Sequence, residues 1–243
     1  RRPSKPKPPA PAPRVWPRWL PGLALIAMTV VAYLPCLNGP QLWDDKDWFG
    51  AMEWNLRGWQ GLLRLWTVPE SIQQYYPVTA MSFWVDHHLW GAWTLPAHLE
   101  NVLLHGGSAV LFWMLLKRLQ IRGAWLAAAL FAMHPVMVES VAWMTERKNV
   151  LCTFFALAAL LAHGKAAGWW ESKEGHGKFF AELLAVMLVV IALLSKVSAA
   201  VLPGVVMVVG WWRSGTLRWR ADGLRVLPWI VLSMPIIWQT SLL

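Results

Sequence analysis

The most constraining feature of this chain is a series of apolar blocks, most of them close to the length that crosses a bilayer. A membrane-spanning helix needs about 20 apolar residues. The 243 residues are 57% hydrophobic and only 14% charged, whereas soluble domains have roughly 45–50% apolar and about 25% charged residues. The chain is therefore predicted to be an all-α integral membrane protein with about seven transmembrane helices. They are expected at residues 19–37, 99–116, 124–141, 150–162, 179–194, 197–212 and from 226 onward.

The basic residues predict how these helices are oriented. Residues 1–17 are rich in Pro, Lys and Arg, so we expect a disordered cytoplasmic tail ahead of a membrane domain over 18–243. If successive loops lie on alternate sides of the membrane, starting with this tail in the cytoplasm, most of the 22 Lys and Arg residues fall on the cytoplasmic side. We therefore interpret the net charge of +9 as a signal of topology and lipid-phosphate contact, not of nucleic-acid binding. The last apolar block has not ended at residue 243, so we expect the domain to continue beyond this residue.

The loop over 38–97 is the longest polar connection and is predicted to face outward. It begins with Asn38-Gly39-Pro40, which ends the first helix. Apolar residues recur at helical spacing over 47–66, and a second helical stretch is expected over 77–90. This pattern is typical of amphipathic helices that lie in the membrane interface. We therefore expect juxtamembrane helices in this loop.

The adjacent carboxylates Asp44 and Asp45 stand where the first apolar block leaves the membrane. Neighbouring carboxylates repel each other, which favours protonation of one of them. One carboxylate is thus a candidate general base that activates a hydroxyl, and the pair is also a candidate site for a divalent cation. The competing interpretation is a solvated turn that caps the amphipathic helix predicted at 46–66.

A second polar cluster brackets the outer turn between the third and fourth blocks. It contains His134, Glu139, Glu146, Arg147 and Lys148. Ionisable groups near membrane depth are costly and usually face a cavity or each other. Arg147 and Lys148 are candidate phosphate ligands, and the other three are candidate supporting groups. The alternative is an internal salt bridge of Arg147 with Glu139 or Glu146.

Two further residues fall on the same outer side. Lys196 lies between the fifth and sixth blocks and is either another phosphate ligand or a lysine that reaches to the interface. Tyr76 precedes the helix predicted at 77–90 and is a candidate supporting polar group. His87 and His88 point about 100° apart on a helix, which makes them a poor chelating pair. No metal ligands are therefore assigned, and a divalent cation is considered only at the acidic pair.

Several motifs, in their order along the chain, resemble one family. They are WDD at 43–45, YYPVT at 75–79, HLENVLLH at 98–105, FAMHPVMVESVAW at 131–143, ERKNVL at 146–151 and LLSK at 193–196. Over residues 19–215 the chain resembles the membrane part of bacterial tetratricopeptide-repeat glycosyltransferase-like proteins. These are similar in turn to the transmembrane-and-tetratricopeptide-repeat O-mannosyltransferases and, more distantly, to the protein O-mannosyltransferases. The combination of motifs is specific, whereas no single motif is.

The resemblance implies a GT-C fold, a helical bundle whose first outer loop carries an acidic pair and juxtamembrane helices. It implies that Asp44 or Asp45 is the catalytic base. It also implies a polyprenyl-phosphate sugar as donor and a hydroxyl of a protein or glycan as acceptor. Arg147, Lys148 and Lys196 are our candidates for binding the donor phosphate. The implied location is the bacterial inner membrane, with a cytoplasmic N-terminus and a multi-pass topology.

The soluble repeats of that family do not follow the apolar blocks in this sequence. Their absence leaves the choice of acceptor open. The alternative function is a non-catalytic scaffold or accessory subunit of a larger membrane complex, built on the same fold. In that case the Trp-rich faces would be contact surfaces for other membrane helices.

Overall fold

In the computed structural model the part of the chain that is described, residues 17–46, 48, 58–72, 74–170, 175–217 and 219–242, is predominantly helical, with short turns and loops between the helices. No strand occurs among these residues. The α-helices are α1 (Leu20–Tyr33), α3 (Gly58–Thr67), α4 (Pro77–Trp90), α5 (Thr94–Arg118), α6 (Ala124–Met133), α7 (Val138–Ala142), α8 (Arg147–Ala166), α9 (Gly175–Ser195), α10 (Leu202–Ser214) and α11 (Leu224–Ser241). Short 3-10 helices are η1 (Leu34–Cys36), η2 (Pro69–Ser71), η3 (Pro135–Met137) and η4 (Val197–Val201), and η5 (Trp219–Gly223) is a π-helical turn.

Each predicted apolar block is helical, and the multi-pass membrane prediction is confirmed. Four helices are long and apolar enough to cross a membrane, namely Thr94–Arg118, Arg147–Ala166, Gly177–Ser195 and Val197–Ser214. The pair Ala124–Met133 and Pro135–Ala142 is bent by 50° and makes a fifth if it forms one span. The apolar helix Leu20–Cys36 is shorter. The described residues thus contain four to five candidate spans by length and composition.

Proline and glycine set several of the helix ends. Pro77 stands at the first position of α4, where a missing N–H and a fixed φ cost nothing. The same helix ends at Gly91, whose φ of +59° is a backbone conformation that glycine tolerates best. At the end of α10, Gly215 has a φ of +69° and is hydrogen-bonded back to Trp211.

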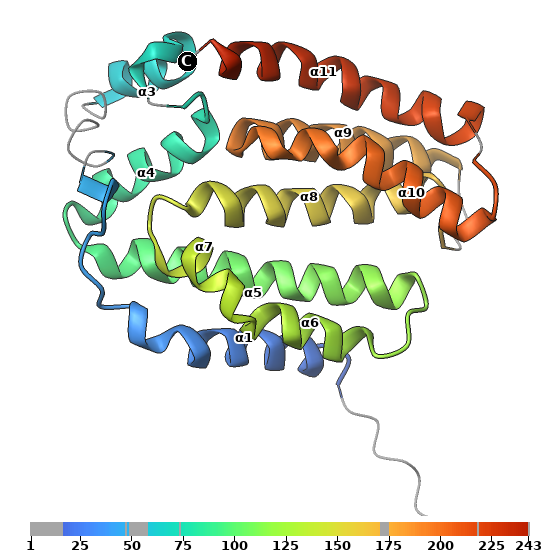
Figure 1. Cartoon of the computed structure of the whole chain (residues 1–243), viewed down its shortest axis with the longest axis horizontal. Helices are drawn as coiled ribbons and strands as arrows, with labels where there is room; N and C mark the ends of the chain where they lie inside the picture. Colours follow the sequence, from blue (N-terminus) through green and yellow to red (C-terminus); the bar gives the residue numbers. More distant parts are fainter. Residues whose placement is uncertain are drawn as a thin grey trace, which may run out of the picture.

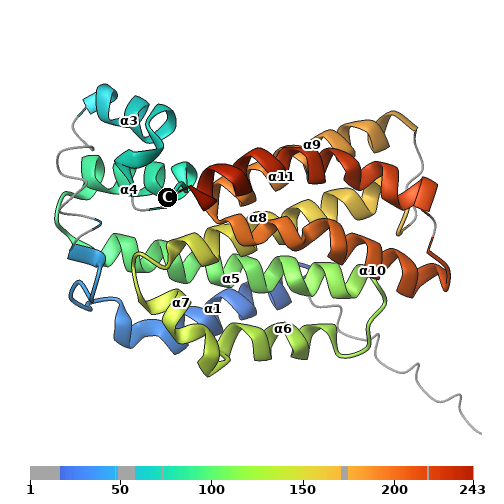
Figure 2. The same cartoon turned by 45° about the horizontal axis from the view of Figure 1, so that its top comes forward.

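The long helices lie side by side, and α8 lies between α5 and α9 (Figures 1 and 2). The α8–α9 contact is the most extensive between any two described elements. Its centre is made of small side chains, of which Ala159, Ala185 and Ala192 are fully buried. Small residues let helix backbones approach closely, which is how helices associate in a membrane.

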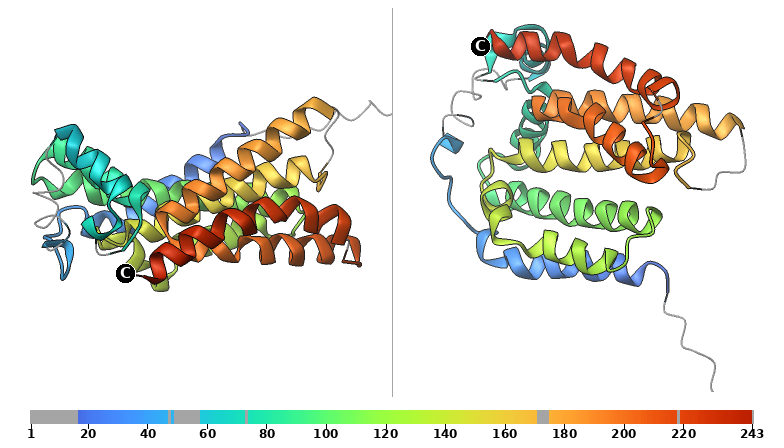
Figure 3. Two further views of the ribbon diagram at one scale, coloured as in Figure 1. Left: turned by 90° about the horizontal axis from the view of Figure 1, so that it is seen from above. Right: turned by 45° about the vertical axis from the view of Figure 1, so that its right-hand side comes forward.

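The helices in the region predicted as the outer loop are α3 and α4, which gather at one end of the bundle (Figures 1 and 3). Helix α4 matches the range predicted at 77–90, and α3 covers the second half of the range predicted at 47–66. The first half of that range, apart from Trp48, lies outside the described residues, as does the predicted tail up to residue 16. At the same end α5 and α8 begin, so this end of the bundle collects the polar residues singled out in the sequence.

Candidate active site

The acidic pair lies in a turn that packs on the loop ahead of α8. Trp43 has a φ of +41°, which is uncommon for a residue with a side chain. Its indole contacts the indole of Trp143 edge-on, with ring centroids 4.6 Å apart. Edge-to-face pairs of this kind are favourable, so the contact holds the turn at residues 42–46 against the loop at 143–146.

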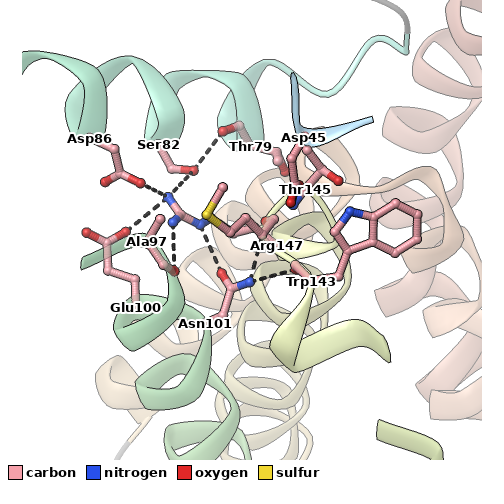
Figure 4. Close-up of polar contacts among 11 residues, drawn as sticks. Asp45, Thr79, Ser82, Asp86, Ala97, Glu100, Asn101, Trp143, Thr145 and Arg147 are labelled. Atoms are coloured by element: carbon pink, nitrogen blue, oxygen red, sulfur yellow. Dashed lines mark hydrogen bonds and ion pairs between the residues drawn. The ribbon is translucent and has the colours of Figure 1, made fainter. Parts of the chain in front are cut away.

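Asp45 is the buried member of the pair. Its Oδ2 accepts a hydrogen bond from the backbone N–H of Leu42 at 2.8 Å, and its Oδ1 accepts one from the N–H of Thr145 at 2.9 Å. The side chain is inaccessible to solvent. Burial raises the pKa of the Asp45 carboxyl, while the two N–H donors oppose that rise. Asp45 therefore ties the turn to the loop ahead of α8, beside Thr145 (Figure 4).

Asp44 is the partly exposed member. Its Oδ1 accepts a hydrogen bond from the Thr145 hydroxyl at 2.9 Å, and its Oδ2 accepts none from the described residues. Thr145 thus holds both carboxylates, Asp45 through its backbone and Asp44 through its side chain. An oriented, partly exposed carboxylate has what a general base needs, namely access to a hydroxyl proton.

Arg147 is completely buried and forms the centre of a second network (Figure 4). Its Nη1 lies 2.6 Å from the Asp86 carboxylate and 3.0 Å from that of Glu100. Its Nε donates to Asn101 Oδ1 and its Nη2 to the carbonyl of Ala97, both at 3.0 Å. The partners come from α4 and α5, so one side chain at the start of α8 joins three helices.

The salt bridge predicted for Arg147 exists, but its predicted partners were wrong. Its partners are Asp86 and Glu100, not Glu139 or Glu146. The reason is tertiary, because the packing of α4 on α5 brings these two acids to the start of α8. The guanidinium also lies 4.6 Å from the ring centroid of Phe83, a favourable cation–π distance.

The two lysines belong to one chain of polar contacts. Lys148 Nζ lies 2.9 Å from Glu146 Oε1. Asn149 donates its amide to the other Glu146 oxygen, and the Lys196 ammonium donates to Asn149 Oδ1. The chain therefore joins the start of α8 to the residue after α9. It contains two cations and one carboxylate, so its net positive charge favours the binding of an anion.

The other predicted supporting residues are more scattered. Tyr76 is buried just before α4, and burial raises the pKa of its phenol. His134 and Glu139 are exposed on the segment that links α6 to α8. The His134 ring accepts a hydrogen bond from the N–H of Val136 and so caps η3. No hydrogen bond within the described part of the chain joins His134 or Glu139 to the acidic pair or to the lysines.

Sequence reasoning missed several members of the site, which are Thr145, Asp86, Glu100, Asn101 and Asn149. Asp86 and Glu100 carry a usable signal, because an acid on an apolar helix calls for a cationic partner. The two asparagines stand inside the HLEN and ERKN motifs, although no role follows from that position. Thr145 gives no signal in sequence. Within the described residues, no group of three or more His, Cys, Asp or Glu side chains is arranged to hold a metal ion.

The similar proteins are protein O-mannosyl-transferases. One from Caenorhabditis elegans is 33% identical over 190 residues, which cover 72% of this chain and 25% of that protein. Protein O-mannosyl-transferase TMTC4 of Homo sapiens is 34% identical over 142 residues, 52% of this chain and 19% of its own length. Protein O-mannosyl-transferase TMTC2 of Mus musculus is 36% identical over 97 residues, 39% of this chain and 12% of its own length.

These findings confirm the resemblance to the O-mannosyltransferases that the motifs indicated. The chain spans a quarter or less of the length of the relatives it matches. No protein-family model matches the chain, and no solved structure matches it significantly.

Proposed function

We propose that this chain is the membrane domain of a glycosyltransferase that moves a sugar from a polyprenyl-phosphate donor to a protein hydroxyl. The observation that carries the proposal is the acidic pair held by Thr145. At the bundle end that also holds Lys148 and Lys196, it presents one carboxylate oxygen that accepts no hydrogen bond from the described residues. The names of the relatives favour mannose as the sugar and a protein as the acceptor.

In this proposal Asp44 is the base, and Asp45 holds the turn that carries Asp44 against the loop ahead of α8. The acceptor hydroxyl oxygen forms a bond to the anomeric carbon as its proton passes to Asp44. The bond from the anomeric carbon to the phosphate oxygen breaks, and its electron pair leaves with the polyprenyl phosphate. Asp45 is assigned no chemical step, because its two oxygens already accept backbone N–H groups out of contact with solvent.

The departing phosphate needs positive charge beside it, and Lys148 and Lys196 supply it. Arg147 was a third candidate for this role, but its N–H groups are engaged by acceptors of the protein. We therefore assign Arg147 to holding the site together. Tyr76 and Glu146, with the more exposed His134 and Glu139, are kept as supporting polar groups of this end.

We further propose a GT-C arrangement with seven spans. Four of these spans would be α5, α8, α9 and α10. The other three would be α1, the bent α6–α7 pair and α11. The proposed topology has a cytoplasmic N-terminus and the acidic pair on the outer face of a bacterial inner membrane. The clustering of Lys117, Arg118 and Arg213 at the opposite bundle end supports this orientation.

Donor turnover tests the proposal with a generic peptide in place of the natural acceptor. The chain is reconstituted in lipid vesicles with polyprenyl-phosphate mannose and a Ser/Thr-containing peptide, and release of polyprenyl phosphate is measured. The variant Asp44→Asn should lower the rate about 100-fold or more, as loss of a general base does. Glu70→Gln, which removes an exposed acid of the same loop, should leave it unchanged.

Two outcomes would overturn the proposal. Equal turnover by the wild-type chain and Asp44→Asn would exclude Asp44 as the base. A wild-type chain that is folded, turns over no donor and copurifies with a stoichiometric membrane partner would instead identify a scaffold subunit.

A further inference from the structure

At the bundle end opposite the acidic pair, the last turns of α5 and α10 and the residues after α8 line an open cavity of about 900 Å³. Ligand-binding pockets have volumes of roughly 300–1,000 Å³, so this cavity has the size of a binding site. Helix α5 has 25 residues, and at about 1.5 Å per residue it separates the two ends by roughly 37 Å. In Figure 1 the ends of α5, α8 and α10 lie on the same side of the bundle.

Among the described residues, the charged side chains that line the cavity are all cations. Lys117 and Arg118 close α5, and Arg213 lies in the last turn of α10. None of the ion pairs in the described residues involves these three side chains. At the other bundle end, by contrast, Arg147 and Lys148 are both paired with acids. Convergent cations that lack acidic partners favour an anionic ligand.

Part of the cavity wall is aromatic. Trp169, Trp170 and Trp212 line it, and the Arg118 guanidinium lies 5.9 Å from the Trp170 ring centroid. A Cβ at Gly164 would come within 2.2 Å of Trp170 Cη2, so only glycine lets this ring lie against α8. Cations that serve only to orient a membrane protein need no shared cavity and no such wall. The geometry therefore indicates a built site.

We propose that this cavity binds a phosphate group carried on a larger molecule, foremost the head group of an anionic phospholipid. The cations would hold the phosphate oxygens, and the indoles would cover the apolar part next to it. A bare phosphate fills only a small part of the volume. Because the site lies at the far end of the bundle from Asp44, it is independent of the proposed donor site.

The test is lipid retention by the full chain. The chain is purified from membranes that contain phosphatidylcholine and phosphatidylglycerol, and bound lipid is identified by native mass spectrometry. The double variant Arg118→Gln/Arg213→Gln should lose at least about tenfold in affinity for phosphatidylglycerol. The control Arg122→Gln/Lys165→Gln removes the same charge from exposed positions at the same end and should bind as the wild type does.

A second arm separates the two sources of phosphate. Glycerol 3-phosphate is titrated into the lipid-free protein, and the shift in its thermal unfolding temperature is recorded. Retention of phosphatidylglycerol without such a shift assigns the site to a lipid, whereas a saturable shift lost in the pocket variant assigns it to a soluble phosphate compound. Equal loss of binding in pocket and control variants, or no bound phosphate compound in either arm, would overturn the proposal. Sugar transfer should be the same in both double variants.

Discussion

At the scale of single residues, two neighbouring carboxylates have different environments. Asp45 is buried and accepts two backbone N–H groups, whereas Asp44 is partly exposed and held by one hydroxyl. The sequence alone cannot separate them, because both have the same side chain at adjacent positions. Their difference comes from Thr145, 100 residues further along the chain from Asp45.

The role of Thr145 as the residue that orients Asp44 predicts a selective loss of rate. Thr145→Val keeps the backbone N–H to Asp45 and the shape of the side chain but removes the hydroxyl. We expect the turnover number to fall about tenfold, which corresponds to roughly 1.4 kcal/mol, with little change in KM or in thermal stability. Thr145→Ser should retain most of the activity. A Thr145→Val variant with wild-type turnover would show that the hydroxyl does not orient the base.

The raised pKa of Asp45 predicts how stability depends on pH. The folded protein keeps the proton on the Asp45 carboxyl up to a higher pH than the unfolded chain does, in which the pKa of an Asp carboxyl is about 3.9. The contribution of this carboxyl to the free energy of unfolding is therefore fully present below about pH 3.9, and it declines as pH rises through the pKa of the folded state. The variant Asp45→Asn should lack this decline when unfolding temperatures in detergent are compared across pH. Parallel curves for the two proteins would contradict the assignment.

At the scale of secondary-structure elements, Arg147 decides how α4 and α5 meet the start of α8. The apolar blocks and the 77–90 periodicity predicted these helices, since each signal is local to the segment that folds. The pairing of Arg147 with Asp86 spans 61 residues and was not predicted, because the sequence offered the nearer acids Glu139 and Glu146 as partners. A buried ion pair depends on tertiary packing, which leaves no local pattern in the sequence.

Breaking this network predicts a large loss of stability. Arg147→Met leaves Asp86 buried without its cation, which costs about 3–5 kcal/mol when one partner of a buried pair is removed. Arg147→Lys should recover only part of it, because lysine lacks the planar fork of donors. Unfolding in detergent measures the effect, and Arg64→Met on the exposed face of α3 is the control. Equal stability of the two Met variants would show that the network does not join the helices.

At the scale of the whole molecule, the charges separate along the bundle. The acidic pair lies at the end where α5 and α8 begin, and the cations Lys117, Arg118 and Arg213 lie at the other. The sequence predicted this separation, because loops alternate between the two sides of a membrane. It could not predict that these cations share a cavity, since the walls come from three segments far apart in the chain.

The proposed orientation predicts which loops are reachable from outside the cell. Single cysteines are introduced by Gln60→Cys on exposed α3 and by Thr216→Cys after α10, with Cys36 and Cys152 replaced by alanine. A membrane-impermeant maleimide should label the first variant in intact cells and the second only after permeabilisation. The reverse pattern would place the acidic pair on the cytoplasmic side.

The most direct test of the central claim compares Asp44→Asn with Asp45→Asn. For each variant the rate of polyprenyl-phosphate release and the unfolding temperature are measured in the same vesicle preparation, and the rate is divided by the folded fraction. The account predicts that Asp44→Asn loses about 100-fold or more in corrected rate at nearly unchanged stability. It predicts that Asp45→Asn loses stability first and retains more of its corrected rate. An Asp44→Asn variant with full corrected activity, or a larger loss in Asp45→Asn, would contradict the assignment of Asp44 as the base.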